Sequence, residues 1–210
     1  MKIAVIGATG STGQNFVKQS LAKGHHVTVL VRSPQKLTIE DPNLNVIIGD
    51  VLNVDDVAHA VSGQDAIFIA LGTGKVPKKS SIRADGTQQV VKALGTASEK
   101  PYIVILSSLG VGDSKKQYPF YWNWILNLFL RYAFADHQQQ EKIIQDSSLP
   151  YAILRPTFMN HKPVTGHAKA TAAPETVNIL ASLPRADVAN YALNAIEKQN
   201  HHRQEVALTA

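Results

Sequence analysis

The sequence contains no cysteine among its 210 residues. It therefore cannot form a disulfide framework, bind a metal through thiolates or use a cysteine nucleophile. Long hydrophobic runs are also missing: polar residues interrupt the most apolar stretch, residues 120–135, which is shorter than the roughly 20 residues that span a bilayer. The apolar run at residues 3–6 is too short for a signal peptide. We therefore expect a cytoplasmic protein without a membrane span.

Clusters of like charge are missing as well. The chain has 21 Lys and Arg residues against 16 Asp and Glu residues, a formal net charge of +5 at pH 7, but the basic residues are scattered. We therefore expect a phosphorylated small molecule as the anionic partner, and no nucleic acid. The 8 histidines show no spacing typical of metal ligands, so no metal site is predicted.

What the sequence does contain is an alternation of short β-branched runs with longer helical patterns. Strands are expected at residues 3–6, 27–31, 45–48, 66–70, 103–106, 152–154 and 205–208, and helices at residues 16–23, 54–61, 83–94, 136–146 and 187–199. This order requires right-handed crossovers and predicts an α/β fold with a doubly wound parallel sheet, a Rossmann fold. We expect a single domain over residues 1–210, with loops at residues 113–117 and 161–174.

A glycine-rich segment, residues 7–13, directly follows the first predicted strand and opens a helix. Gly7 permits a tight turn, Gly10 lets the backbone approach a pyrophosphate, and Gly13 lets the helix pack close to the strand. Three hydroxyl side chains add possible donors: Thr9, Ser11 and Thr12. This context favours a dinucleotide-binding loop over a purely structural glycine turn.

The end of the second predicted strand indicates which dinucleotide binds. Loops specific for NAD carry Asp or Glu there, whereas this chain has Arg32 and Ser33, with Lys36 four residues beyond the arginine. A guanidinium can bind the 2′-phosphate of NADP(H) through charge-assisted hydrogen bonds. The sequence therefore favours NADPH over NADH, although both cations could be ordinary solvated loop charges.

Two further strand ends are candidates for cofactor contacts. Residues 49–51 close the third strand, where the Asp50 carboxylate could accept a hydrogen bond from the adenine amino group. Residues 71–74 close the fourth strand near the point where ligands gather in such sheets. Either segment could equally be a simple turn.

Taken together, the motifs resemble the atypical short-chain dehydrogenase/reductases, and within them the NAD(P)H-binding group that contains the flavin reductase/biliverdin reductase B type and the NmrA-like proteins. The motifs lie at residues 7–13, 27–32, 49–51, 63–66, 71–73, 107–108, 154–156 and 187–189. The resemblance implies a monomer or homodimer whose acceptor site lies over the nicotinamide, at the carboxyl ends of the strands. It implies these cofactor-binding residues: Gly7, Thr9, Gly10, Ser11, Thr12, Gly13, Arg32, Ser33, Lys36, Asp50, Val51, Leu71, Gly72, Thr73, Ser107, Pro156 and Thr157.

The chain departs from the family at two points. It lacks the Tyr-x-x-x-Lys pair of typical short-chain dehydrogenases, since Asp136 stands four residues after Tyr132. This absence fits the biliverdin reductase B branch and argues against an alcohol dehydrogenase. Members of that branch carry a histidine after the sixth strand, where this chain reads Arg155-Pro156-Thr157-Phe158, so biliverdin is disfavoured as the physiological acceptor.

These features predict an NADPH-dependent oxidoreductase that transfers a hydride to a small flat acceptor such as a flavin or quinone, which requires stacking more than a strong acid. Ser108 is the candidate catalytic donor, unless it only satisfies nearby backbone. The aromatic residues 118–124 are a candidate acceptor wall or an ordinary packing surface. His137 and Glu141, one helical turn apart, could shuttle a proton, but an exposed helix pair is the expected arrangement. The alternative function is an NmrA-like NADP(H) sensor that acts through a protein partner. A sugar-nucleotide epimerase is disfavoured by the missing Tyr-x-x-x-Lys pair.

Overall fold

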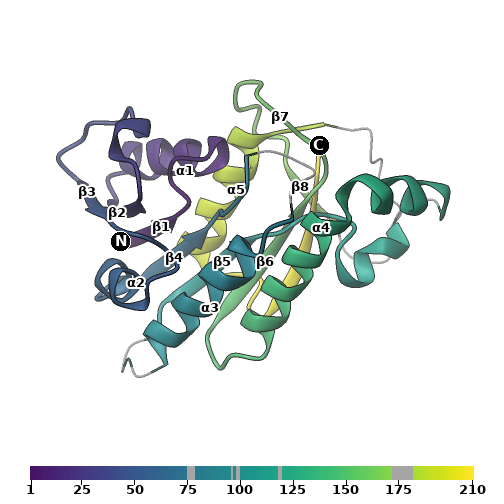
Figure 1. Ribbon diagram of the computed structural model, residues 1–210. Helices are drawn as coiled ribbons and strands as arrows, with labels where there is room; N and C mark the ends of the chain where they lie inside the picture. Colours follow the sequence, from purple (N-terminus) through teal and green to yellow (C-terminus); the bar gives the residue numbers. More distant parts are fainter. Residues whose placement is uncertain (75–78, 96, 98–99, 118–119, 172–181) are drawn as a thin grey trace.

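Figure 1 shows the protein as a computed structural model, which describes residues 1–74, 79–95, 97, 100–117, 120–171 and 182–210. Eight strands form one sheet, in the spatial order β3-β2-β1-β4-β5-β6-β10-β8. Their bounds are β1 Lys2–Ile6, β2 His26–Val31, β3 Leu44–Ile48, β4 Ala66–Ile69, β5 Tyr102–Leu106, β6 Tyr151–Pro156, β8 Lys169–Thr171 and β10 Gln204–Thr209. All neighbours pair in parallel except β8, which runs antiparallel to β10. The predicted doubly wound Rossmann fold is confirmed.

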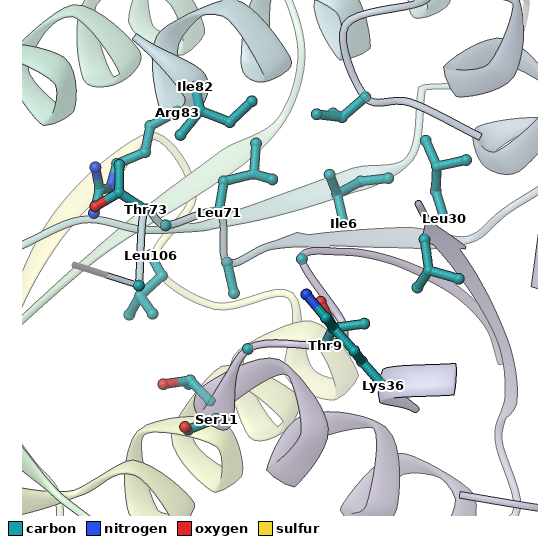
Figure 2. Close-up of a pocket in the computed structure, with 18 of the residues that line it drawn as sticks. Ile6, Thr9, Ser11, Leu30, Lys36, Leu71, Thr73, Ile82, Arg83 and Leu106 are labelled. Carbon is teal, nitrogen blue, oxygen red and sulfur yellow. The ribbon is translucent and has the colours of Figure 1, made fainter. Parts of the chain in front are cut away.

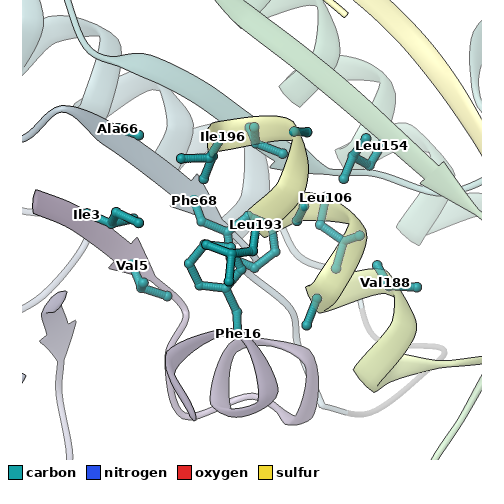
Figure 3. Close-up of a cluster of buried hydrophobic side chains, with 14 of the residues drawn as sticks. Ile3, Val5, Phe16, Ala66, Phe68, Leu106, Leu154, Val188, Leu193 and Ile196 are labelled. Atoms are coloured by element: carbon teal, nitrogen blue, oxygen red, sulfur yellow. The ribbon is translucent and has the colours of Figure 1, made fainter. Parts of the chain in front are cut away.

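Helices cover both faces of this sheet (Figure 1). One face packs against α1 (Ser11–Ala22) and α5 (Arg185–Lys198). The other face packs against α2 (Val54–Val61), α3 (Ile82–Leu94) and α4 (Phe120–Gln145). Figure 3 shows the first of these two cores, where Phe16 of α1 stacks on Phe68 of β4 with ring centroids 4.3 Å apart. Burial on both faces explains why the central strands read as continuous apolar runs.

The register brings the carboxyl ends of four strands to the same level. Ile6 at the end of β1 pairs with Leu30 of β2 and with Ile69 of β4, and Ile69 pairs in turn with Ile105 of β5. Residues that follow these strand ends therefore lie close together, and this edge of the sheet is where doubly wound folds bind ligands.

Three local expectations are wrong. The helix expected from residue 136 begins at Phe120, and residues 112–117 form a short 3-10 helix, η2 (Gly112–Gln117), in place of a loop. The expected loop 161–174 contains β8, and β7 (Met159–Asn160) pairs with β9 (Leu183–Pro184) in a small second sheet. The side chains of residues 117–129 lie outside the described part, so the proposed aromatic wall at 118–124 does as well. Among the described residues, no helix has the length and apolar character needed to cross a bilayer.

Candidate cofactor and acceptor site

A pocket of about 600 Å³ lies across the carboxyl ends of β1, β2, β4 and β5. Most of the predicted cofactor-binding residues line it: Gly7, Thr9, Gly10, Ser11, Thr12, Arg32, Lys36, Val51, Leu71, Gly72, Thr73 and Ser107. Figure 2 shows lining side chains from the glycine loop on one side, and from the segment after β4, the end of β5 and the start of α3 on the other. Residues far apart in the sequence are therefore gathered into one site.

The glycine loop owes its shape to close backbone approaches. Gly7 has a φ of +95°, and a Cβ there would lie 2.5 Å from the carbonyl oxygen of Ala70. A Cβ on Gly13 would lie 2.3 Å from the carbonyl oxygen of Gly7, so only glycine lets α1 pack this close to the loop. Gly10 differs, because the nearest atom to its added Cβ would be 3.4 Å away and the group would stand in the pocket.

The start of α1 has the properties of a pyrophosphate site. Gly10 is its N-cap residue and has no side chain to accept a hydrogen bond from the first turn. The N–H groups of that turn therefore face the pocket without a side-chain acceptor. Free N–H groups and the helix dipole both favour an anion at this position. An open cradle at Gly10 next to these donors fits the diphosphate of a dinucleotide.

One side chain ties the glycine loop to the predicted 2′-phosphate site. Gln14 Nε2 donates to the carbonyl oxygens of Thr9, at 3.2 Å, and Lys36, at 3.3 Å. The short 3-10 helix η1 (Pro34–Lys36) is thereby held against the loop, and Lys36 lies beside Thr9 in Figure 2. Arg32, at the end of β2, lines the same region of the pocket. The arrangement fits a phosphate group near both cations.

Other predicted residues are not among the described lining residues: Gly13, Ser33, Asp50, Ser108, Pro156 and Thr157. The Asp50 carboxylate accepts a hydrogen bond from the N–H of Leu52 at 3.0 Å, which is a turn contact. The Ser108 hydroxyl donates to the carbonyl oxygen of Leu109 at 3.1 Å. Both contacts match the structural alternatives that the sequence left open.

Ser107, in contrast, lines the pocket and belongs to a buried polar network. Its hydroxyl donates to Glu141 Oε1 at 2.5 Å. Arg155 Nε and Nη2 donate to the two oxygens of Glu141 at 3.0 and 2.8 Å, and Arg155 Nη1 donates to Asp113 at 2.6 Å. Burial lowers the pKa of the Arg155 guanidinium, but the bonds and charges of Glu141 and Asp113 outweigh burial and raise it overall. The guanidinium of Arg155 therefore stays charged, and the Ser107 hydroxyl is directed toward Glu141.

The expectation of an exposed His137–Glu141 pair is wrong. His137 is 8% exposed and Glu141 is 3% exposed, because α4 packs this face onto the sheet. His137 lines the pocket, and its Nδ1 is buried without a hydrogen-bond partner in the described part of the chain. Burial, and next the charge of Arg83, outweigh the effect of the Gln140 side chain and lower the pKa of His137 to about 3. The imidazole is therefore neutral near pH 7.

Arg83 is a pocket residue that sequence analysis did not identify. The carboxylate of Asp136 accepts from the backbone N–H groups of Arg83 and Ala84, at 3.3 and 3.0 Å, and from Arg83 Nη1 at 3.0 Å. Asp136 thus caps the start of α3 and holds the guanidinium at the pocket, beside Thr73 in Figure 2. Only the position of Arg83 at a predicted helix start, after the fourth strand, hinted at this location.

The segments around β7 and α5 supply three more lining residues that the sequence did not indicate. Met159 and His161 follow β6, and Arg185 opens α5. Arg185 Nη1 donates to the carbonyl oxygen of Met159 at 3.0 Å, which links the two segments. Among the described residues, no group of three or more His, Asp or Glu side chains could hold a metal ion.

Comparison with known proteins agrees with this geometry. Residues 7–199 match the NAD(P)H-binding protein family. The whole chain is 28% identical to the uncharacterised sugar epimerase YhfK of Bacillus subtilis, 94% of which it covers. A short-chain dehydrogenase/reductase from Veillonella parvula, solved with NADP, shares the fold with a TM-score of 0.83 at 20% identity, over 100% of this chain and 94% of that one. The anaerobillin reductase ChuY from Escherichia coli O157:H7 has a TM-score of 0.82 at 22% identity, over 100% and 97%.

The family match covers most of the chain and includes the glycine loop, both cations after β2 and the strand ends that line the pocket. The predicted membership of an NAD(P)H-binding family and the predicted nicotinamide dinucleotide cofactor are confirmed. The chain therefore belongs to the NAD(P)H-binding family, and it shares the fold of a short-chain dehydrogenase/reductase that was solved with NADP.

Proposed function

We propose that the protein transfers a hydride from NADPH to a small flat acceptor, such as a flavin or a quinone. The observation that supports this proposal is the continuity of the pocket. It runs from Arg32 and Lys36, past the helix start at Gly10, to Ser107 and His137 beside the end of β5. A single pocket can thus bind a phosphorylated dinucleotide at one end and an acceptor at the other.

The residues of the chain would act mainly by binding and orientation. The first-turn N–H groups of α1 would hold the pyrophosphate, Arg32 and Lys36 the 2′-phosphate, and residues 71–73 the nicotinamide ribose. When bound, NADPH supplies the hydride, and the acceptor gains that hydride and one proton. The neutral imidazole of His137 lines the same pocket and would form part of the wall around the acceptor.

Ser108 as the catalytic donor stays a prediction. Its hydroxyl donates to the carbonyl oxygen of Leu109, so that bond would have to break before Ser108 could reach an acceptor. The hydroxyl of Ser107 is directed toward Glu141. A flavin or quinone can take its proton from solvent, so neither serine is required for hydride transfer to such acceptors.

A turnover assay tests the proposal. Purified protein is mixed with NADPH and, in turn, with FMN, riboflavin, quinones and tetrapyrroles, and absorbance at the nicotinamide band is followed. Oxidation that depends on the protein and saturates with one acceptor is the expected result. Tight NADPH binding without turnover across the whole panel would overturn the proposal in favour of the sensor function.

Partners and location also stay predictions. We propose a monomer or homodimer in the cytoplasm that binds no nucleic acid. Size-exclusion chromatography with light scattering measures the oligomeric state, and fractionation of expressing cells measures the location.

A further inference from the structure

We propose that the acceptor carries an anionic group, a carboxylate or a phosphate, and that Arg83 binds this group at the end of the pocket opposite Lys36. The inference rests on the proposed function, because it specifies which acceptors the same site takes. Its support comes from the charges that line the pocket and from the position of the Arg83 guanidinium.

The described lining residues carry basic charge without acidic charge. Four of them are Lys or Arg and two are His, whereas none is Asp or Glu: Arg32, Lys36, Arg83, Arg185, His137 and His161. Arg32 and Lys36 lie at the end where the cofactor's 2′-phosphate is proposed to bind. Figure 2 shows Arg83 at the other end, beside Thr73 and away from Lys36. The 2′-phosphate therefore cannot account for the cation at Arg83.

The guanidinium of Arg83 is held in place but only partly satisfied. Its side chain is 11% exposed, and its Nη1 donates to Asp136. Nε is buried and has no hydrogen-bond partner among the described residues. Nη2 lies 3.7 Å from where a Cβ on Gly72 would stand, so the group faces the end of β4. Because Nε is buried, Nη2 beside Gly72 of the pocket lining is the donor that an anionic ligand would meet.

His137 lines the pocket together with Arg83. It is 8% exposed, and its Nδ1 is buried, so that atom is closed to a ligand. Because the imidazole is neutral near pH 7, it adds no negative charge that would repel an anion at this end of the pocket. Arg83 is therefore the group that attracts an anionic ligand there, and His137 does not oppose it.

Two matched pairs of acceptors test the inference. FMN and riboflavin differ by one phosphate, and biliverdin and its dimethyl ester differ by two carboxylates. We expect kcat/KM to favour the anionic member of at least one pair by about tenfold or more, the effect of one charge-assisted hydrogen bond. A preference confined to the flavins would identify phosphate as the ligand, and one confined to the tetrapyrroles would identify carboxylate.

The variant Arg83→Gln should remove that preference, because it raises the KM of the anionic acceptor by more than the KM of its neutral partner. Arg83→Lys should restore part of it. Lys92→Gln removes a charge from the last turn of the same helix, outside the described lining, and should leave the preference unchanged. If Arg83→Gln instead weakens NADPH and leaves the acceptor preference intact, Arg83 serves the cofactor and the inference is wrong.

Binding to the wild-type protein gives a measurement that needs neither turnover nor a variant. The protein is saturated with NADP⁺, and the quenching of flavin fluorescence is followed for FMN and riboflavin, with absorbance for the tetrapyrrole pair. Tighter binding of an anionic member without turnover of any acceptor would refute the proposed function but retain the anionic subsite. Equal affinity within both pairs would overturn the subsite itself.

Discussion

Gly10 and Gly13 lie three residues apart, yet an added methyl group has different consequences at each. At Gly10 it would stand in the pocket with no protein atom closer than 3.4 Å. We expect Gly10→Ala to raise the Kd for NADPH roughly tenfold, or about 1.4 kcal/mol of binding free energy. The Tm of the unliganded protein should hardly change. Calorimetric titration and thermal melting measure the two quantities.

Gly13→Ala is the matched comparison for that variant. Its methyl group would lie 2.3 Å from the carbonyl oxygen of Gly7, so the backbone of the loop must shift. Overpacking of this kind costs about 1–3 kcal/mol of stability. A similar loss of Tm in both variants would contradict the difference between the two sites.

The charge at the end of β2 determines the predicted cofactor preference. Arg32→Asp should raise the Kd for NADPH about tenfold or more and leave the Kd for NADH nearly unchanged, because only NADPH has a 2′-phosphate for the carboxylate to repel. Titration of both cofactors measures the preference. Lys18→Asp makes the same charge reversal on an exposed residue of α1 outside the described lining. If it weakens NADPH equally, the effect belongs to net charge and not to Arg32.

The residues of the site differ in how far the sequence could predict them. Gly7, Gly10 and Lys36 follow local patterns, because a glycine loop and a strand end are read from neighbouring residues. Arg83 has no such pattern. Its ion pair with Asp136 joins residues 53 positions apart, so the contact exists only once α3 and α4 pack together.

At the scale of elements, α4 contributes His137 to the pocket and, one turn later, binds strand β6. Its Glu141 makes a bidentate ion pair with Arg155 of β6, and both side chains are buried. Glu141→Gln removes the carboxylate charge, so the buried guanidinium of Arg155 loses its buried counter-charge. We expect a loss of about 3 kcal/mol or more of unfolding free energy, measured by urea denaturation.

A second ion pair on the same helix provides the control. Lys142 and Asp146 are 3.8 Å apart and both side chains are 67% exposed. Asp146→Asn should change the unfolding free energy by less than about 1 kcal/mol, because water screens an exposed pair. Equal losses in Glu141→Gln and Asp146→Asn would mean that burial does not determine the strength of these pairs.

The predicted start of α4 at residue 136 was wrong for a reason that the sequence contains. No glycine or proline occurs between residues 120 and 145, so nothing in that interval breaks the helix. The aromatic residues 118–124 drew attention away from this continuity, because they fit either an acceptor wall or a packing surface. The edge strand β8 was missed because it has three residues and depends on pairing with β10.

At the scale of the whole molecule, buried His137 makes stability depend on pH. Its pKa is about 3 in the folded protein and 6.5 ordinarily, so between these values the unfolded chain binds one more proton than the folded chain. The free energy of unfolding therefore falls as pH is lowered below about 6.5. We expect His137→Gln to lose less stability than the wild type between about pH 7 and pH 5, measured by urea midpoints.

The pH range over which stability is lost distinguishes the effect of His137 from that of a carboxylate such as Asp187. Burial raises the pKa of Asp187, but hydrogen bonds from Thr165 and Gly166 outweigh it and lower the pKa below its usual value. Its contribution to stability is present above the pKa of the unfolded chain and is lost only in stronger acid. His59→Gln is the control, because His59 is an exposed residue of α2. The stability of this variant should change with pH as that of the wild type does. If His137→Gln also follows it, the buried imidazole is not the source.

The sequence alone determined the Rossmann fold, the glycine loop and the cations after β2. Each depends on residues that are neighbours in the chain or on the order of strands and helices, which local patterns reveal. Only the tertiary structure decided that Arg83 and His137 line the pocket, that Glu141 is buried against Arg155, and that Ser108 is not among the described lining residues. These properties depend on how α3 and α4 pack onto the sheet, and no local pattern records packing between distant segments.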